Sequence, residues 1–402
     1  MFSLVYNEVD ALEINPGGRL SLEQIIGRER EIDRYWDVLG RQGLVLSSER
    51  RLGKTHILFK MHEIGRDGFV TFYQDLEKVH SPLEFVRSLY TAVSSHLSKS
   101  GKAKKALIDA WAKVGPKKIK ELDVPQARDN WKGLLSVAID DILAVIPQDH
   151  KVVFFWDELP LMLHTFHKRE GADVTIQLLD LLRALRQGNG ERLRFLFTGS
   201  IGLHLVLRAL KAVGSISDPI NDMFQETVPP MADEEAREVA TRLLLRVRPF
   251  PGDIAPLAES IVQAVGGFPY YIHHVADRLN MIGRPIKLAD VDQVVGELVS
   301  ADQDPAHFGH NIDRIRIYYS PEEARISFTV LDIVASGDKP PTLPQLINLV
   351  RHKHVEVTDD QVRDVCTLLQ KDHYLARNSG PEPRAYDFRW KLLKQWWKGA
   401  RS

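Results

Sequence analysis

The pattern of hydrophobic and polar positions divides the chain into two parts. Up to about residue 230, short continuous apolar runs alternate with segments whose apolar residues recur every three or four positions. The runs predict strands buried on both faces of a parallel sheet, and the periodic segments predict helices between them. This alternation indicates an α/β, three-layer domain with a parallel sheet. The expected strands lie at 44–47, 69–73, 151–157 and 194–200, with a last strand at 226–230 that its prolines confine to an edge or an end.

Beyond Asp233 the apolar positions follow a helical period only. Amphipathic segments predict a small all-α domain, and residues 302–318 read as its connector to the last part. That part reads as helix, helix, helix and hairpin, which is typical of a winged helix-turn-helix domain. The expected helices are 234–247, 254–265, 269–281, 290–299, 321–335, 342–352 and 358–371, and a Trp-rich helix at 390–397 follows the hairpin at 374–388. Thr358 is the expected N-cap of the helix at 358–371. The predicted organisation is an N-terminal arm (1–26), an α/β core (27–231), a helical lid (232–312) and a winged-helix domain (313–402).

The first apolar run leads into a candidate phosphate-binding loop. Gly53, Lys54 and Thr55 follow a strand and open a helix, as in the pattern G-x-x-x-x-G-K-[S/T], although Ser48 replaces the first glycine. Backbone N–H groups of such a loop surround a polyphosphate, the lysine reaches the outer phosphates, and the threonine hydroxyl holds Mg²⁺. A helix start with a chance Lys-Thr pair is the alternative. The residues expected at the nucleotide are Ser48, Glu49, Arg50, Arg51, Leu52, Gly53, Lys54, Thr55 and His56.

The apolar run at 151–157 supplies the second half of this site. It ends in Asp157 and Glu158, and a carboxylate at the end of a buried strand can hold Mg²⁺ while its neighbour acts on the attacking water. Taken alone, the two acids would read as a helix cap. Their spacing from the Gly-Lys-Thr motif favours an ATP site with Glu158 as base. Thr198 and Ser200 end the next strand, where they would contact the γ-phosphate or orient water, unless they are ordinary loop residues.

Composition adds limits but no further chemistry. The chain has 402 residues and a formal net charge of −1, which predicts no global attraction to nucleic acid or membrane. The single cysteine, Cys366, excludes a disulfide within the chain and reads as a core residue. The N-terminal residues do not have the layout of a signal peptide, so a cytoplasmic location is expected. Between Lys99 and Lys120 lie eight lysines, which form a solvated face or a phosphate-backbone contact.

Several motifs together resemble those of the AAA+-related signal-transduction ATPases (STAND), and within them the archaeal-type ATPase family. They are Gly27-Arg-Glu-x-Glu31, Arg50-Arg-x-Gly-Lys-Thr55, Asp157-Glu158, Phe197-Thr-Gly-Ser200 and Gly266-Gly-x-Pro269. The resemblance implies ATP and Mg²⁺, with Gly27 and Arg28 near the adenine, Pro269 closing over it, and Thr198 or Ser200 as γ-phosphate sensor. From the residues alone, Gly27 and Arg28 read as an exposed helix start. Relatives often carry an arginine near 218–224; this chain has none there, which favours slow turnover.

Three functions stay open at this level. The first is an ATP-driven switch whose state is read by a protein partner or by self-association through the lid and winged helix. The second is a DNA-binding ATPase similar to replication initiators, which would use the lysine-rich segment with Arg377 and Arg384. Asp359, Asp360 and Asp364 on the expected recognition helix favour the first over the second, because carboxylates repel phosphates. The third is a scaffold that binds ATP without hydrolysing it, against which the intact Lys54 and acidic pair argue.

Overall fold

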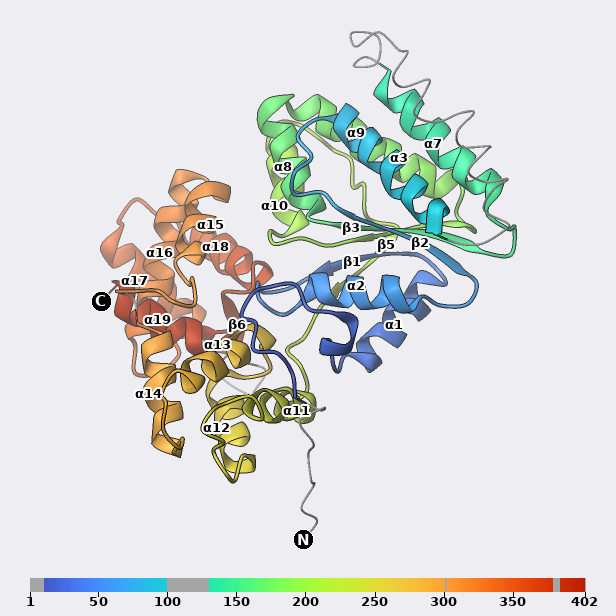
Figure 1. The fold of residues 1–402 in the computed structure, drawn as a ribbon. Coiled ribbons are helices and arrows are strands. Elements are labelled where there is room, and N and C mark those ends of the chain that lie inside the picture. Colours follow the sequence, from blue (N-terminus) through green and yellow to red (C-terminus); the bar gives the residue numbers. More distant parts are fainter. Residues whose placement is uncertain (1–10, 100–129, 301, 379–383, 402) are drawn as a thin grey trace. The chain divides into compact units, whose positions relative to one another are not determined.

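The structure, a computed structural model, describes residues 11–99, 130–300, 302–378 and 384–401 (Figure 1). The chain forms two compact units. The first, called the α/β unit below, contains residues 28–47 and 54–228. The second, called the helical unit, contains the described residues up to 27, the short segment 48–53, and the described residues from 229 onward.

The α/β unit is built on a five-stranded sheet of order β2-β3-β4-β1-β5 in which every neighbouring pair is parallel. The strands are β1 (Gly43–Ser47), β2 (Phe69–Asp75), β3 (Lys151–Asp157), β4 (Leu193–Phe197) and β5 (Met223–Thr227). The predicted parallel sheet is therefore confirmed. The last strand is an edge strand as expected, but it ends before Pro229 rather than containing the prolines.

Helices cover both faces of this sheet, which confirms the three-layer prediction. Two lie on one face, and the others lie on the opposite face (Figure 1). The first two are α1 (Glu29–Leu39) and α2 (Lys54–Ile64); the others are α3 (Pro82–Lys99), α7 (Trp131–Val145), α8 (Leu159–Arg169), α9 (Ala172–Gly188) and α10 (Leu203–Ala212). The sequence pattern had not indicated α8 and α10, two short helices that directly follow β3 and β4.

Aromatic packing fixes the centre of the sheet. Trp156 on β3 stacks on Phe195 of β4 with ring centroids 4.6 Å apart, and its indole N–H donates to Gln74 Oε1 on β2 at 2.8 Å. The opposite face packs Leu58 and Phe155 with residues of α1 in a fully buried cluster. Because both faces are apolar, the strands have no alternating pattern, and the polar groups gather where the strands end.

The helical unit begins with a short 3₁₀ turn, η2 (Leu22–Gln24), and continues after residue 229 with a four-helix group. These helices are α11 (Asp233–Leu244), α12 (Ala255–Val265), α13 (Pro269–Asn280) and α14 (Leu288–Leu298). The prediction of a connector at 302–318 was wrong in its second half, because His310–Tyr318 forms a further helix, α15. Asn311 and Arg314 are buried on α15, so the inward face of this helix is partly polar. Its apolar residues therefore do not show a helical period in the sequence.

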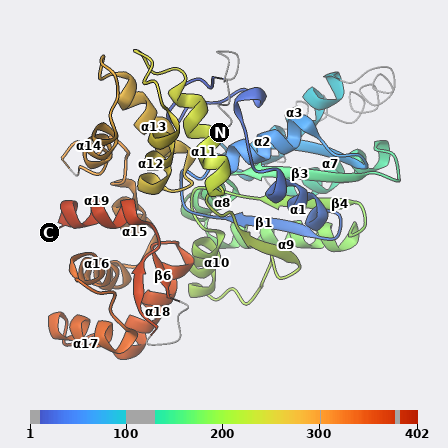
Figure 2. The same cartoon turned by 90° about the horizontal axis from the view of Figure 1, so that it is seen from below.

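The C-terminal part is a winged helix-turn-helix domain, as predicted (Figure 2). Its elements are α16 (Pro321–Ser336), α17 (Leu343–Lys353), α18 (Asp359–Lys371), the antiparallel strands β6 (Leu375–Arg377) and β7 (Tyr386–Phe388), and α19 (Lys391–Arg401). Thr358 caps α18 by accepting a hydrogen bond from Gln361 N, so the expected N-cap is confirmed. Cys366 is a buried core residue of α18. In the part of the chain that the structure describes, none of the helices has the length and apolar character needed to cross a membrane.

Candidate functional site

The start of α2 and the end of β3 meet through one hydrogen bond. Thr55 Oγ1 donates to Asp157 Oδ2 at 2.7 Å, although 102 positions separate the two residues. Asp157 is 3% exposed, and its burial raises the pKa of the carboxyl, while the Thr55 hydrogen bond and the charge of Lys54 act in the opposite direction. A hydroxyl and a carboxylate are thus held side by side next to an ammonium group.

Glu158 is held by Ser200, which lies three residues after the end of β4. Its Oε2 accepts hydrogen bonds from Ser200 N at 2.9 Å and from Ser200 Oγ at 2.8 Å. Glu158 itself has a left-handed backbone, with φ of 58°, and is the N-cap position of α8. Burial raises the pKa of Glu158, and the two Ser200 hydrogen bonds oppose that rise. Ser200 therefore contacts the expected base directly and fixes the direction of its carboxylate.

Gly199 makes this contact sterically possible. A Cβ at this position would lie 2.7 Å from Pro160 Cδ and 3.4 Å from Glu158 Oε2. A side chain would therefore push the turn after β4 away from the acidic pair. The glycine of the Phe197-Thr-Gly-Ser200 motif is explained by this close approach.

Thr198 lies between these groups, at the end of β4. Its backbone is fixed on both sides, since its N–H donates to Trp156 O at 3.1 Å and its carbonyl accepts from Leu159 N at 3.2 Å. The side chain is 1% exposed, and its Oγ1 has no hydrogen-bond partner among the residues that the structure describes. Buried hydroxyls are normally paired, so this one is an acceptor and donor available to a bound group.

The loop Ser48–Gly53 joins β1 to α2 in the chain. Gly53 has a φ of 85°, and a Cβ there would meet no atom within 4 Å, so the backbone conformation and not the space requires glycine. Arg51 also has a left-handed φ, of 76°. Ser48 does not have a positive φ, and its Oγ donates a hydrogen bond to the carbonyl of Glu49 at 2.9 Å. The departure from glycine at this position is therefore tolerated by the backbone.

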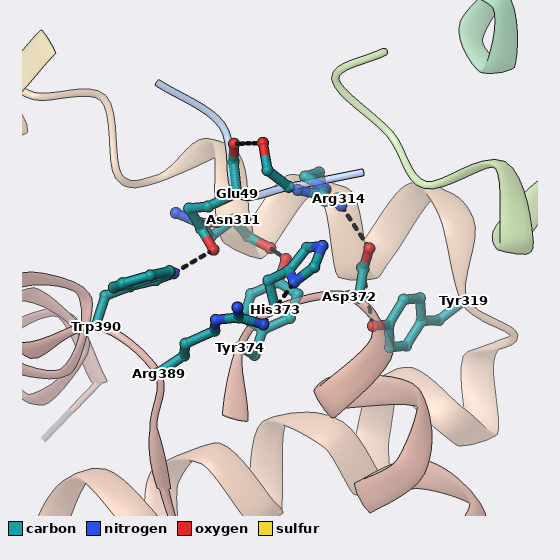
Figure 3. A network of polar contacts seen from close by, with 10 residues as sticks. Glu49, Asn311, Arg314, Tyr319, Asp372, His373, Tyr374, Arg389 and Trp390 are labelled. Atoms are coloured by element: carbon teal, nitrogen blue, oxygen red, sulfur yellow. Dashed lines mark hydrogen bonds and ion pairs between the residues drawn. The ribbon is translucent and has the colours of Figure 1, made fainter. Parts of the chain in front are cut away.

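Two side chains of this loop contact other parts of the helical unit. Glu49 Oε2 accepts a hydrogen bond from the indole Nε1 of Trp390 at 2.8 Å (Figure 3). The Arg51 guanidinium lies over the ring of Tyr270, 4.0 Å from its centroid. The sequence analysis missed both contacts, and no local signal could have shown them, because residues 49 and 390 are 341 positions apart.

The remaining predicted residues lie at element boundaries. Gly27 has a φ of 74°, and Arg28, 3% exposed, precedes α1 and forms an ion pair with Glu31 at 2.8 Å. Pro269 is the first residue of α13. The other expected loop and helix positions are the buried Leu52, the half-buried His56 in the first turn of α2, and Arg50.

The candidate DNA contacts lie apart from these groups in the chain. Residues 100–129, which contain most of the lysine-rich segment Lys99–Lys120, lie outside the described part of the chain. Arg377 ends β6 with its guanidinium 5.7 Å from the centroid of the Tyr386 ring, and Arg384 is exposed. On α18, Asp360, Arg363 and Asp364 are exposed, so the surface of this helix is not uniformly basic.

Comparison with known proteins gives the fold. Neither a protein-family model nor a curated protein sequence matches this chain. Among solved structures, the Walker-type ATPase PABY2304 of Pyrococcus abyssi is similar over 93% of this chain and 96% of its own, with a TM-score of 0.62 and 14% identity. The ORC2 protein of Aeropyrum pernix, in ADPNP–ADP complexes, covers 92% of this chain and 93% of its own, with a TM-score of 0.51 and 12% identity. The predicted resemblance is confirmed at the level of the fold: the chain has the fold of the archaeal-type AAA+ P-loop ATPases.

Proposed function

We propose that this protein binds and hydrolyses ATP and acts as a molecular switch. The observation that supports the proposal is the hydrogen bond of 2.7 Å between Thr55 Oγ1 and Asp157 Oδ2, because these two residues are the expected ligands of Mg²⁺ and the charge of Lys54 acts on Asp157. The meeting of Thr55 and Asp157 in the folded chain is what an ATP site needs. The ADPNP–ADP complexes of the similar ORC2 protein add support from a relative in fold.

The residues present fit a bound Mg²⁺–ATP. Magnesium prefers hard oxygen ligands and keeps several water molecules, so one hydroxyl and one carboxylate suffice when phosphate oxygens supply the rest. Thr55 and Asp157 would hold the ion, and the ion would neutralise charge on the phosphates. The loop 48–53 and the N-terminus of α2 would surround the phosphates, with Lys54 on the outermost ones.

Glu158 would act as the general base toward the attacking water. Ser200 occupies its Oε2 with two hydrogen bonds and leaves Oε1 to accept the proton. The buried Oγ1 of Thr198, without a partner among the described residues, would contact the γ-phosphate. In this proposal Thr198 is the γ-phosphate sensor and Ser200 positions the base, whereas the sequence alone allowed either residue to be the sensor.

The switch would act through the parts that follow the core. The proposed parts are a core (27–231), a lid (232–312) and a winged helix (313–402). Gly27 and Arg28 of the core would lie near the adenine, and Pro269 of the lid would close over it. A protein partner or self-association is favoured over DNA, because the exposed carboxylates Asp360 and Asp364 on α18 would oppose phosphate binding in the major groove.

Hydrolysis and binding assays on two variants test the proposal. We expect Lys54→Ala to abolish ATP binding, and Glu158→Gln to bind ATP while its hydrolysis falls by at least a hundredfold. A Glu158→Gln variant that hydrolyses ATP at the wild-type rate would exclude Glu158 as the base. Steady-state hydrolysis with and without duplex DNA at low salt separates the two classes of partner: strong stimulation by DNA contradicts the preference for a protein partner.

A further inference from the structure

The phosphate-binding loop is attached to the C-terminal part of the chain by its own side chains. Residues 48–53 belong to the helical unit, whereas the residues on either side of them, in β1 and α2, belong to the α/β unit. Within the helical unit, Glu49 accepts the indole hydrogen bond of Trp390, and Arg51 stacks on Tyr270. Trp390 directly precedes α19, the last helix of the winged-helix domain, and Tyr270 belongs to α13.

The Trp390 indole is itself held in place. Its ring meets the ring of Phe268 edge-on, with centroids 4.7 Å apart and an angle of 85° between the planes. Phe268 is part of the Gly266-Gly-x-Pro269 motif and precedes α13. In Figure 3 the indole points its nitrogen at the carboxylate of Glu49. One side chain thus touches both the phosphate-binding loop and the motif that the resemblance associates with the nucleotide.

The hydrogen bond between Trp390 and Glu49 matters because Glu49 carries a negative charge in the loop. Glu49 is 7% exposed, and a buried carboxylate needs hydrogen-bond donors. It also stands in a loop that would surround a polyphosphate, where a negative side chain facing the ligand would repel it. The hydrogen bond from Trp390 supplies one such donor, at Oε2, and draws that oxygen toward the indole.

There is space beside this contact for the indole to move. A cavity of about 330 Å³ in the helical unit is lined by Glu49, Phe268 and Trp390, together with residues at the end of α12 and the start of α19. A displacement of Trp390 into this cavity would therefore break the hydrogen bond without forcing the indole into occupied space.

We propose that Trp390 is a positioning residue for the phosphate-binding loop, and that the position of α19 controls nucleotide affinity through the hydrogen bond from Trp390 to Glu49. The proposal deepens the proposed function and rests on it, since it names the side chain that connects the winged-helix domain to the nucleotide. A partner that moves α19 would release Glu49 and weaken nucleotide binding.

Trp390→Phe removes the N–H donor and keeps an aromatic ring against Phe268. We expect it to weaken the binding of a fluorescent ADP analogue about tenfold, the effect of one lost hydrogen bond to a charged group. Trp396→Phe is the matched control, because Trp396 lies on the same helix and its buried Nε1 has no hydrogen-bond partner in the described residues. This control should bind the analogue as wild type does.

A double-mutant cycle isolates the contact. In a Glu49→Ala background the indole has no carboxylate to hold, so Trp390→Phe should then change ADP affinity less than twofold. Additive losses, or wild-type affinity of Trp390→Phe, would overturn the proposal.

Hydrogen exchange without nucleotide keeps this test separate from the proposed function. Amides of residues 48–53 should exchange faster in Trp390→Phe than in wild type or Trp396→Phe, whether or not the protein hydrolyses ATP. Unchanged exchange would refute the positioning role. Absence of ADP binding by the wild type would instead refute the proposed function.

Discussion

A buried ion pair near the loop 48–53 allows a quantitative test of how the helical unit is held together. Arg314 on α15 and Asp372, which follows α18, pair with Nη2 and Oδ1 2.5 Å apart, and their side chains are 8% and 1% exposed (Figure 3). Tyr319 donates its hydroxyl to the other oxygen, Asp372 Oδ2, at 3.0 Å. Asp372→Asn keeps an acceptor for Tyr319 but removes the charge that compensates the buried guanidinium.

The expected cost follows from the burial of both partners. Removing one member of a buried ion pair leaves the other charge uncompensated and typically costs about 3–5 kcal/mol, whereas exposed pairs contribute below about 1 kcal/mol. Asp372→Asn should therefore lower the free energy of unfolding of the helical unit by about 3 kcal/mol or more. The exposed pair of Arg316 and Asp313, 3.9 Å apart on the same helix, supplies the control. Asp313→Asn should cost less than about 0.5 kcal/mol.

Urea unfolding followed by hydrogen exchange in peptides of α15 and α18 measures this quantity for the helical unit alone. Replacing both partners at once, as Arg314→Met with Asp372→Leu, should recover part of the loss, since neither charge of this pair remains. The recovery should be incomplete because the buried Glu49 also interacts with the charge of Arg314. If Asp372→Asn costs no more than the Asp313→Asn control, the pair is solvated in solution, and its assignment as a structural link is wrong.

Three further predictions concern the acidic pair and the group of helices α11 to α14. Ser200→Ala removes a hydrogen-bond donor that lowers the pKa of Glu158, so the pKa of Glu158 should rise further. Because the base must be ionised, the rate of hydrolysis should begin to fall at a higher pH than in wild type as the pH is lowered. Superimposable pH–rate profiles of the variant and the wild type would contradict this. Gly267→Ala would place a Cβ 2.1 Å from Met231 O, and should destabilise the protein by about 1–3 kcal/mol in thermal unfolding. Gly296→Ala in α14, where a Cβ meets nothing within 4 Å, should instead stabilise it by about 0.5–1 kcal/mol.

Local sequence patterns predicted what local interactions determine. The run at 151–157 is fully apolar up to its terminal aspartate because β3 is covered on both faces, so the strand and its polar end were visible from the sequence. The cap at Thr358 was equally visible, since capping involves residues three positions apart. The motif of Gly53, Lys54 and Thr55 was also visible from the sequence, because a single loop and the start of one helix supply all of its residues.

Helix α15 shows why other elements escaped prediction. Its buried face includes Asn311, whose Nδ2 donates to Phe308 O three positions earlier, and Arg314, whose charge is compensated by a distant residue. Asp372, the partner of Arg314, is 58 positions away. A search for apolar periodicity treats such a face as exposed, so the segment read as a connector. The error is physical: compensation between distant polar groups leaves no periodic signal.

The same reasoning separates the candidate site into a part that the sequence reveals and a part that it does not. Residue types around a phosphate are restricted by chemistry, so the motif that ends in Lys54 and Thr55 predicts a phosphate ligand even without the fold. The proposed control of nucleotide affinity has no such restriction, because any hydrogen-bond donor that reaches Glu49 could hold its carboxylate. In this chain the donor is an indole 341 positions away. Proteins with the same loop motif can therefore share a ligand and differ in what regulates it, and the difference is to be sought in the contacts of the loop's variable positions.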